Sequence, residues 1–371
     1  MEDGYLVSSP TSHACSTTHL AEQRKINTGS TTFRRVSSPL SKTNINSMCL
    51  IRKALQMSKL SEKTCDIILR SWRESTQKQY QVYLKKYNVF CIERDRNPLQ
   101  PSELSALEFL TLLHEQGQKY SAINSARSAL SALYSILGVN NFGSNSLISR
   151  FMKGIYESDT PMPRYKETWD VSVVLNYLKN LKENEFLSLP DLTLKLCALL
   201  ALITAQRTQT LHSIRVSCIH KVDKGINIEI IDKIKNSKPG VETVLKLEPY
   251  HDKKLCVIET LENYLERTRK LRKGHDKLFL CYKSPFQASS KNTISRWIKT
   301  VMDRAGIDVS VFKPHSVRSA SSSAMLREGT PLEKVLKRAG WSSASTFYRF
   351  YNRKIESNNL NSQNLILNYL R

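Results

Sequence analysis

The sequence predicts a mainly helical α+β protein, in which a helical bundle precedes a second domain of helices with a small antiparallel sheet. Three observations support this prediction. Apolar residues recur at three- and four-residue steps through 61–160, two nearby prolines then interrupt the pattern, and an alternating apolar pattern follows near Ile226. With 371 residues, the chain is long enough for two domains with separate cores.

The N-terminal region differs from the rest of the chain in composition. Residues 1–58 are rich in Ser, Thr and Asn with interspersed Lys and Arg, and they sustain no apolar period. We therefore expect a mostly disordered basic tail, with room for a short helix around Met48–Leu60. The helical periodicity that follows predicts a compact bundle over 59–160.

Four amphipathic helices make up the expected bundle. The first begins after Ser71, and the second runs from about Ser102 to Gln116 with Ser102 as its N-cap. The third has the clearest period and is bounded by Ser121 and Gly138, residue types that favour helix starts and helix ends. A fourth amphipathic helix follows this glycine.

A break in periodicity marks the end of the bundle. Pro161 and Pro163 stand too close together for a helix interior, so we expect a linker over 161–168. A second domain is expected over 169–357, followed by a C-terminal tail over 358–371.

The second domain combines helices with one hairpin. Isoleucines alternate with polar residues from Ile226 to Ile230, and Pro239-Gly240 marks a turn before a return strand over 241–247. The expected helices lie near residues 171–184, 191–205, 254–272, 290–305, 316–327, 331–338 and 343–353.

The charge of the chain narrows its range of partners. The hydrophobic fraction of 40% is ordinary, but the net charge of +23 predicts a polyanionic partner, and nucleic acid is the usual one. A basic but unrelated enzyme and a membrane-surface protein are the alternatives. The longest apolar run has about ten residues, half of the roughly 20 that span a bilayer, so no membrane segment is expected.

The cysteines give no sign of a metal site or a disulfide framework. All eight are scattered without close Cys-Cys or Cys-His pairs, which excludes a zinc-finger spacing. We expect no signal peptide and reduced thiols, as in a cytosolic or nuclear protein.

Two arginines have the chemistry to hold a phosphate. A DNA phosphodiester under attack gains negative charge on its non-bridging oxygens, which a planar, permanently charged guanidinium matches. Arg207 ends a strongly apolar helix. Arg318 follows His315 by three residues, so His315 and Arg318 lie on one helix face. No carboxylate cluster has a metal-binding spacing, so these arginines are the candidates for neutralising that charge.

Three further residues complete the candidate set. Lys235 stands near the tip of the expected hairpin and is suited to protonate a leaving oxygen, although the neighbouring Lys233 and Lys238 compete for this role. Trp341 carries an indole N–H that can reach a phosphate oxygen. Tyr351 is the candidate nucleophile, and its phenol needs a base or nearby cations to react at neutral pH.

These residues, in this order and spacing, resemble the tyrosine recombinase (phage integrase) family over roughly residues 60–355. The segments 206–211, 339–343 and 346–351 look most like the recombinases of eukaryotic DIRS-type retrotransposons. The expected bundle is similar to the core-binding domain of that family, and the second domain to its catalytic domain.

The resemblance implies a concrete activity. Tyr351 would attack the scissile phosphate to form a 3′-phosphotyrosyl bond, Arg207 and Arg318 would clamp the phosphate, and Lys235 would act as general acid. His315 would assist as a base, and Trp341 as a hydrogen-bond donor. The reaction would need no cofactor and no metal. The two domains would close around double-stranded DNA as dimers or tetramers, in the nucleus or in the cytoplasm before nuclear entry.

The sequence departs from the family pattern at two places. Many members carry an acidic residue three after the first arginine, where this chain has Thr210. Many also place the tyrosine nine residues after the Trp341 position, whereas Tyr351 lies ten after it. Tyr348 shares a helix face with Tyr351 and is therefore the competing nucleophile.

Two other functions remain open from the sequence. A DNA-binding protein of the same fold that lost catalysis through domestication or decay would keep the basic bundle. A type IB topoisomerase would use the same chemistry to relax supercoils. The complete residue set favours a recombinase or integrase of a mobile element over both.

Overall fold

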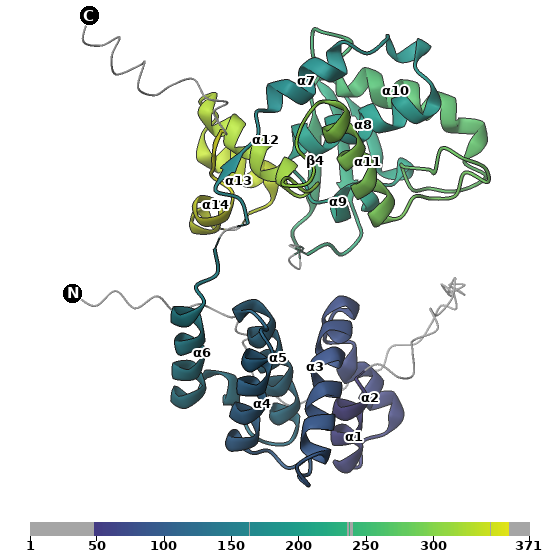
Figure 1. Cartoon of the computed structure of the whole chain (residues 1–371). Coiled ribbons are helices and arrows are strands. Elements are labelled where there is room, and N and C mark those ends of the chain that lie inside the picture. The colour runs from purple at the N-terminus through teal and green to yellow at the C-terminus, as the bar shows by residue number, and fades with distance from the viewer. Residues whose placement is uncertain (1–47, 163, 236, 238–239, 342, 356–371) are drawn as a thin grey trace, which may run out of the picture. The chain divides into compact units, whose positions relative to one another are not determined.

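The computed structural model describes residues 48–355 apart from 163, 236, 238–239 and 342 (Figure 1). The chain divides into two compact units, residues 1–161 and 162–371. The predicted fold class is confirmed, because the described part is mainly helical with a small antiparallel sheet. Most of the expected N-terminal tail, the C-terminal tail over 358–371 and Lys238 lie outside the described residues.

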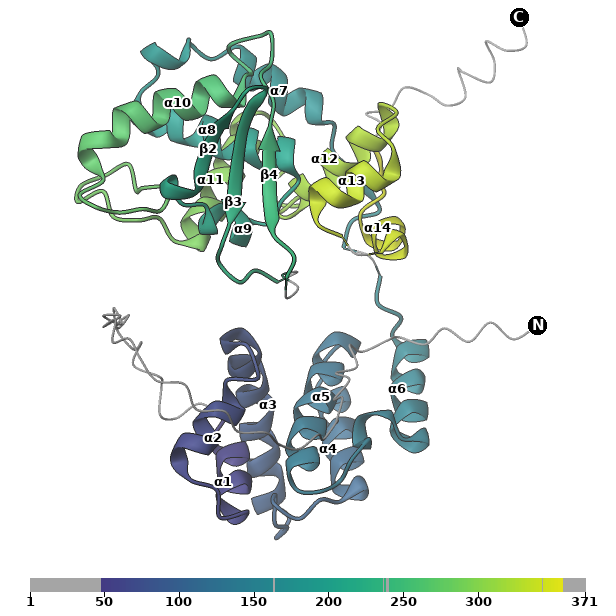
Figure 2. The same ribbon diagram turned by 180° about the vertical axis from the view of Figure 1, so that it is seen from behind.

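The first unit is a helical bundle around one apolar core. Its helix α5 contacts α1, α3, α4 and α6 and is therefore central to the packing (Figure 2). The helices are α1 (Cys49–Met57), α2 (Glu62–Leu69), α3 (Glu74–Ile92), α4 (Glu103–Glu115), α5 (Tyr120–Ile136) and α6 (Ser146–Ser158), with a 3-10 turn η1 (Phe142–Ser144).

The folded bundle begins earlier than the expected boundary at residue 59. Helix α1 buries Leu50, Ile51, Ala54 and Leu55 in the same core as the other helices, and Arg52 forms an ion pair with Asp66 of α2 at 2.6 Å. These apolar residues recur at helical spacing, so a segment expected within the tail is part of the domain.

The cap predictions have mixed outcomes. Ser102 caps α4 by accepting from Ser105 N, and Gly138 follows α5 with a left-handed φ of 90°, both as expected. Ser121 is not a cap, because α5 begins at Tyr120 after Lys119. The Tyr120 ring packs edge-on against Tyr156 at 5.3 Å, which favours an earlier start of this helix.

The second unit packs helices around a three-stranded antiparallel sheet in the order β2-β3-β4 (Figure 2). Ile228 of β3 lies opposite Ile219 of β2 and Leu245 of β4. The strands are β2 (Ile219–Val222), β3 (Gly225–Ile230) and β4 (Thr243–Leu247). The sequence did not predict β2, which is mostly exposed and therefore lacks an alternating apolar signal.

Helix α8 is the centre of this unit. Nearly all of its residues are buried, and it contacts α9, α10, α11 and α12. The helices are α7 (Val171–Lys179), α8 (Leu189–Thr204), α9 (Thr208–Ser213), α10 (Val257–Thr268), α11 (Lys291–Arg304), α12 (Ser316–Arg327), α13 (Leu332–Ala339) and α14 (Ala344–Phe350), with 3-10 turns η2 (Asn184–Phe186), η3 (Val216–Cys218) and η4 (Arg269–Leu271).

Among the described residues, no helix has both the length and the apolar character needed to cross a membrane.

The expected linker over 161–168 is partly structured. Strand β1 (Glu167–Thr168) pairs in parallel with β5 (Lys354–Ile355), which follows α14. The Tyr165 ring packs against Phe312 at 5.5 Å. Residues 164–168 therefore belong to the packed second unit, because backbone pairing and aromatic contacts hold them there.

Candidate active site

Short segments at the ends of helices carry five of the six candidate residues. Arg207 is the N-cap of α9, His315 is the N-cap of α12, and Arg318 lies in the first turn of that helix. Trp341 follows Gly340, whose φ of 67° ends α13, and Tyr351 is the C-cap of α14. Lys235 lies in the connection between β3 and β4. Helix ends leave backbone groups and side chains accessible, which suits a binding site.

Arg318 is the most deeply buried member of the set. Its side chain is 1% exposed, its Nη1 donates to the carbonyl of Ala205 at 2.7 Å, and its guanidinium stacks on the Trp341 ring at 4.1 Å. Burial lowers the pKa of Arg318 to about 9, the charge of Arg207 acts in the same direction, and Tyr351 opposes both. The guanidinium therefore stays protonated at neutral pH.

Three buried N–H groups around this stack lack an acceptor. Within the described part of the chain, Arg318 Nε, Arg318 Nη2 and Trp341 Nε1 have no hydrogen-bond partner. Buried donors are rarely left unsatisfied, so such a group in a native protein calls for an explanation. An anion placed against the guanidinium and the indole would satisfy them.

His315 and Tyr351 form a polar pair next to this stack. His315 Nε2 lies 3.3 Å from Tyr351 Oη, and the two rings meet edge to face. The Tyr351 ring also packs against Trp341 at 4.6 Å, and the Arg318 guanidinium lies 5.5 Å from its centre. The phenol thus contacts a potential base and a cation at once.

Protein atoms and cations hold His315 in its neutral form. Its pKa is lowered to about 4, first by desolvation and then by the charges of Arg318, Arg207, Lys235 and Arg164. Because His315 is exposed, desolvation alone would lower its pKa little, and the four positive charges secure the direction of this shift. A neutral imidazole is able to accept the proton of a phenol at physiological pH.

The backbone of Tyr351 is fixed by helix α12. Its carbonyl accepts hydrogen bonds from Ser319 Oγ and Ser323 Oγ, both at 2.7 Å, and its N–H donates to Phe347 O at 2.8 Å. These serines are small, so they also allow close packing of helix α12. Their hydroxyls have the additional effect of holding the nucleophile candidate against the helix that carries His315 and Arg318.

Tyr348 has a different environment. Its side chain is 50% exposed and its ring packs against Phe347 at 5.5 Å. The contacts described above with His315, Arg318 and Trp341 all belong to Tyr351. The geometry therefore favours Tyr351 over Tyr348 as the nucleophile.

The turn that carries Arg207 is tied to α13 by a residue that the sequence did not single out. Gln206 Nε2 donates to Arg338 O at 2.6 Å, and Gln206 Oε1 accepts from Thr210 Oγ1 at 3.2 Å. In return, Arg338 Nη1 donates to Ile203 O at 3.2 Å. Thr210, at the place where many relatives carry an acid, thus acts on the residue beside Arg207.

Of the two described lysines on the β3–β4 connection, Lys235 acts on the charge of His315. Both Lys233 and Lys235 are exposed, but only the charge of Lys235 is among those that lower the pKa of His315. The two lysines lie two residues apart on the same connection. This difference therefore favours Lys235 over Lys233 for the general-acid role.

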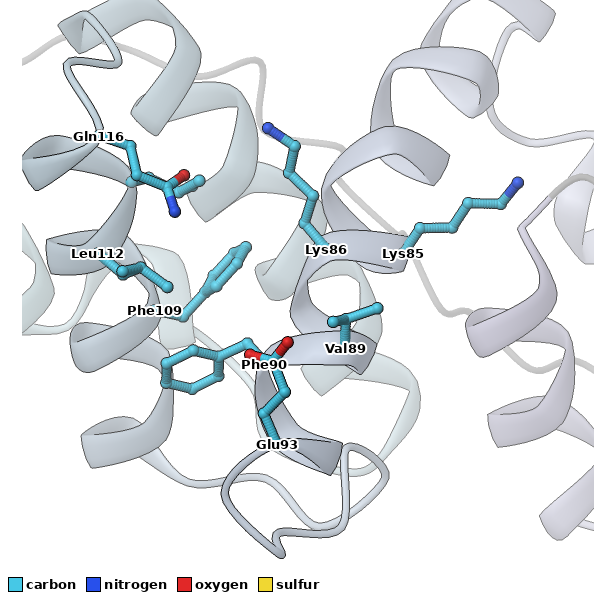
Figure 3. Close-up of a pocket in the computed structure, with 9 residues that line it drawn as sticks. Lys85, Lys86, Val89, Phe90, Glu93, Phe109, Leu112 and Gln116 are labelled. Atoms are coloured by element: carbon cyan, nitrogen blue, oxygen red, sulfur yellow. The ribbon is translucent and has the colours of Figure 1, made fainter.

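A separate groove lies in the first unit, between α3 and α4 (Figure 3). It has a volume of about 370 Å³, with Phe90, Phe109 and Leu112 in its wall and Lys85 and Lys86 beside it. None of the six candidates lines it. The candidate site is therefore the arrangement of side chains around Tyr351.

Comparison with known proteins identifies the family. The Phage integrase family matches residues 172–357, just over half of the chain and all six candidates. No curated protein matches the chain.

Solved structures share the fold at low sequence identity. XerH recombinase bound to palindromic difH substrate, after cleavage, is 14% identical with a TM-score of 0.57, over 89% of this chain and 90% of that chain. A lambda integrase tetramer bound to a Holliday junction is 15% identical with a TM-score of 0.51, over 85% and 81%. The Tn1549 transposon integrase with transposon right end DNA is 15% identical with a TM-score of 0.51, over 87% and 99%. The chain therefore belongs to the phage integrase family of tyrosine recombinases.

Proposed function

We propose that this protein is a site-specific recombinase or integrase that breaks and rejoins double-stranded DNA through a covalent bond to Tyr351. The observation that carries the proposal is the set of three buried N–H donors on Arg318 and Trp341 that lack acceptors in the described structure, beside the Tyr351 phenol. A phosphodiester placed there would accept from these donors and lie next to a nucleophile.

The proposed cleavage follows from the positions of the side chains. Tyr351 Oη attacks the scissile phosphorus and passes its proton to His315 Nε2, which lies 3.3 Å away. The P–O5′ bond breaks as the Tyr351 O–P bond forms, which leaves a 3′-phosphotyrosyl end. Lys235 gives a proton to the departing 5′-oxygen. Reversal of these steps with another 5′-hydroxyl rejoins the strand and needs no ATP.

The two arginines stabilise the charge that develops during this step. Arg318 presents its two free N–H groups from a site with 1% exposure, where solvent screens the interaction little. Arg207 adds a second positive charge from the N-cap of α9. The tie from Gln206 to Arg338 holds this turn in place, as an acidic residue would be expected to do in many relatives.

The partner and setting of this reaction are also proposed. A net charge of +23 favours binding to the phosphate backbone of duplex DNA. We propose assembly of two or four copies on DNA and a nuclear role in a mobile element of the DIRS-type retrotransposon class. Sequencing the DNA that flanks the coding region tests the last point, since terminal repeats are expected there and their absence would count against it.

A nicked suicide DNA substrate tests the catalytic proposal. On such DNA the cleaved product diffuses away, so the wild type is expected to accumulate an SDS-resistant covalent complex. Tyr351→Phe should abolish this complex, because it removes the attacking oxygen, and Tyr348→Phe should retain it.

The controls separate the remaining alternatives. If the wild type binds duplex DNA in a salt-dependent way but forms no adduct on any recognised site, the protein is a DNA-binding member that lost catalysis. Relaxation of supercoiled plasmid without strand exchange would instead indicate a topoisomerase-like activity. Loss of the adduct in Tyr348→Phe alone would show that the nucleophile is misassigned.

A further inference from the structure

The segment that enters the second unit from the linker runs directly to the catalytic candidates. We call Arg164–Trp169 the entry segment. Tyr165 Oη accepts from Lys313 N at 3.1 Å, two residues before His315. The charge of Arg164 is one of the four that lower the pKa of His315. The entry segment therefore touches the loop that leads into α12.

Trp169 makes the deepest of these contacts. Its side chain is 3% exposed, and its Nε1 donates to Ser316 Oγ at 2.9 Å across a buried interface. Ser316 is itself 2% exposed and stands directly after His315 at the start of α12. Loss of either partner would leave the other as an unsatisfied polar group in the interior, which makes this bond costly to break.

The same segment also reaches the region after Tyr351. Strand β1 pairs in parallel with β5, with Glu167 opposite Lys354 and Thr168 opposite Ile355. Strand β5 begins three residues after Tyr351. The entry segment is thus bonded to residues that flank His315 on one side and to the strand that follows Tyr351 on the other.

We propose that the entry segment positions the His315–Tyr351 pair, and that Trp169 acts as a positioning residue through its hydrogen bond to Ser316. The inference rests on the proposed function, since it assigns Trp169 a part in the proton transfer from Tyr351 to His315.

Trp169 differs from an ordinary core residue because its hydrogen bond sets the position of the α12 start, and with it the position of His315. His315 faces Arg318 from α12, Arg207 from α9, Lys235 from the β3–β4 connection, Arg164 from the entry segment and Tyr351 after α14. A small displacement of the α12 start changes the distance from the imidazole to all of these groups. Catalysis and the titration of His315 should therefore respond together when the Trp169–Ser316 bond is removed.

A double-mutant cycle tests this assignment. The full-length wild type, Trp169→Phe, Ser316→Ala and the double variant are compared for the single-turnover rate of adduct formation at saturating suicide DNA. Each single change should lower the rate by about three- to tenfold, the range that corresponds to one net hydrogen bond. The double variant should be no slower than the slower single variant, because both changes remove the same bond.

Trp297→Phe is the matched control. Trp297 is 2% exposed in the core of the same unit, and its ring packs on Phe279 and Tyr282. Its adduct rate should stay within about twofold of wild type once folding is confirmed by circular dichroism. DNA affinity should be unchanged in all variants, so that the loss appears in the rate of cleavage.

A second readout is independent of cleavage. The titration of the His315 ring, followed by NMR in the free protein, should move upward from its low value toward the ordinary 6.5 in Trp169→Phe and stay in place in Trp297→Phe. If Trp169→Phe does not fold, Ser316→Ala and Tyr165→Phe carry the test from the other end of the contacts. Additive losses in the cycle, an equal loss in Trp297→Phe, or an unmoved His315 titration would overturn the inference. A wild type that forms no adduct would refute the proposed function, while the His315 titration would still decide whether Trp169 positions that ring.

Discussion

Two tyrosine environments, one in each unit, show how differently this chain treats a phenol: Tyr87 pairs with Tyr134, and Tyr351 pairs with His315. In the first unit, Tyr87 Oη lies 2.7 Å from Tyr134 Oη, and Tyr134 Oη donates to Ser102 O at 2.9 Å and accepts from Ser102 N at 3.2 Å. Both rings are fully buried. Desolvation raises the pKa of each phenol, so both stay protonated and act as cross-links between helices.

In the second unit, Tyr351 stands beside a neutral histidine and a buried arginine instead of a second phenol. Its backbone is bonded to Ser319 and Ser323, while its hydroxyl remains available on the side of His315. In the first environment, both phenol hydroxyls have hydrogen-bond partners. In the second, N–H donors on Arg318 and Trp341 lack acceptors within the described residues. Single buried polar atoms elsewhere in the described residues, such as Lys195 Nζ, also lack partners, so the clustering of three such donors beside one phenol is what distinguishes the candidate site.

Arg318→Lys should have the largest effect on this difference. A lysine cannot donate to Ala205 O, stack on Trp341 and present two further N–H groups, so the charge on the attacked phosphate would lose its fixed donors. We expect the single-turnover adduct rate to fall by about 100- to 1,000-fold, the usual cost of losing such a donor.

Arg304→Lys is the matched control for that substitution. Arg304 forms an ion pair with Asp191 at 2.9 Å on the surface of the second unit, and its side chain is 47% exposed. Its replacement should leave the adduct rate nearly unchanged. An Arg318→Lys variant that cleaves within a few-fold of wild type would show that the stacked guanidinium is a structural feature.

Tyr87→Phe tests the other half of the comparison. The substitution removes one hydroxyl from the closed network and keeps the ring, which packs on Phe109 at 5.3 Å. Unfolding in urea should show a loss of about 1 kcal/mol in the free energy of unfolding, the net value of a buried hydrogen bond. The adduct rate should be unchanged. If the variant lost cleavage but kept its stability, Tyr87 would have a role in the reaction, and the contrast with Tyr351 would be wrong.

The sequence predicted the candidate site better than the local details that support it. The sequence could name Arg207, His315, Arg318, Trp341 and Tyr351 as candidates because their chemistry and order are readable in one dimension, and their catalytic roles stay predictions. Their neighbours were missed, since the roles of Gln206, Ser319, Ser323 and Trp169 depend on contacts between segments more than 25 residues apart. Their side chains are common and carry no local pattern.

The fold shows a similar division. Strongly periodic helices such as α5 and α8 were predicted, because their apolar residues mark one buried face or an entirely buried helix. Strand β2 and the β1–β5 pair were missed, because short strands with exposed residues leave no apolar alternation to detect. Helix α1 was placed in the tail because its neighbours upstream have the composition of an unstructured segment.

The pH response is expected to be the smallest effect on cleavage and the most direct view of the Tyr351 environment. The pKa of His315 is lowered to about 4, so its ring remains a proton acceptor well below neutrality. At DNA concentrations well below saturation, where the free protein sets the pH dependence, the adduct rate should therefore hold nearly constant from pH 7.5 to about 5.5, whereas a histidine with an ordinary pKa of about 6.5 would lose about tenfold of its neutral form by then. Single-turnover rates over this range make the measurement, and a fall centred near pH 6.5 would contradict the assignment.

The lowered pKa of His315 also predicts how the free energy of unfolding changes with pH, which can be measured without DNA. Below about pH 6.5, His315 of the unfolded chain becomes protonated, whereas in the folded protein it becomes protonated only near pH 4. The folded state therefore binds fewer protons than the unfolded state between these pH values. The contribution of His315 to stability is therefore intact above about pH 6.5, declines as the pH falls, and levels off below about 4. His315→Gln removes the titrating group, so its urea midpoint should fall less between pH 7 and 4.5 than that of the wild type. Equal slopes for the two proteins would mean that the cations around Tyr351 do not act on this ring.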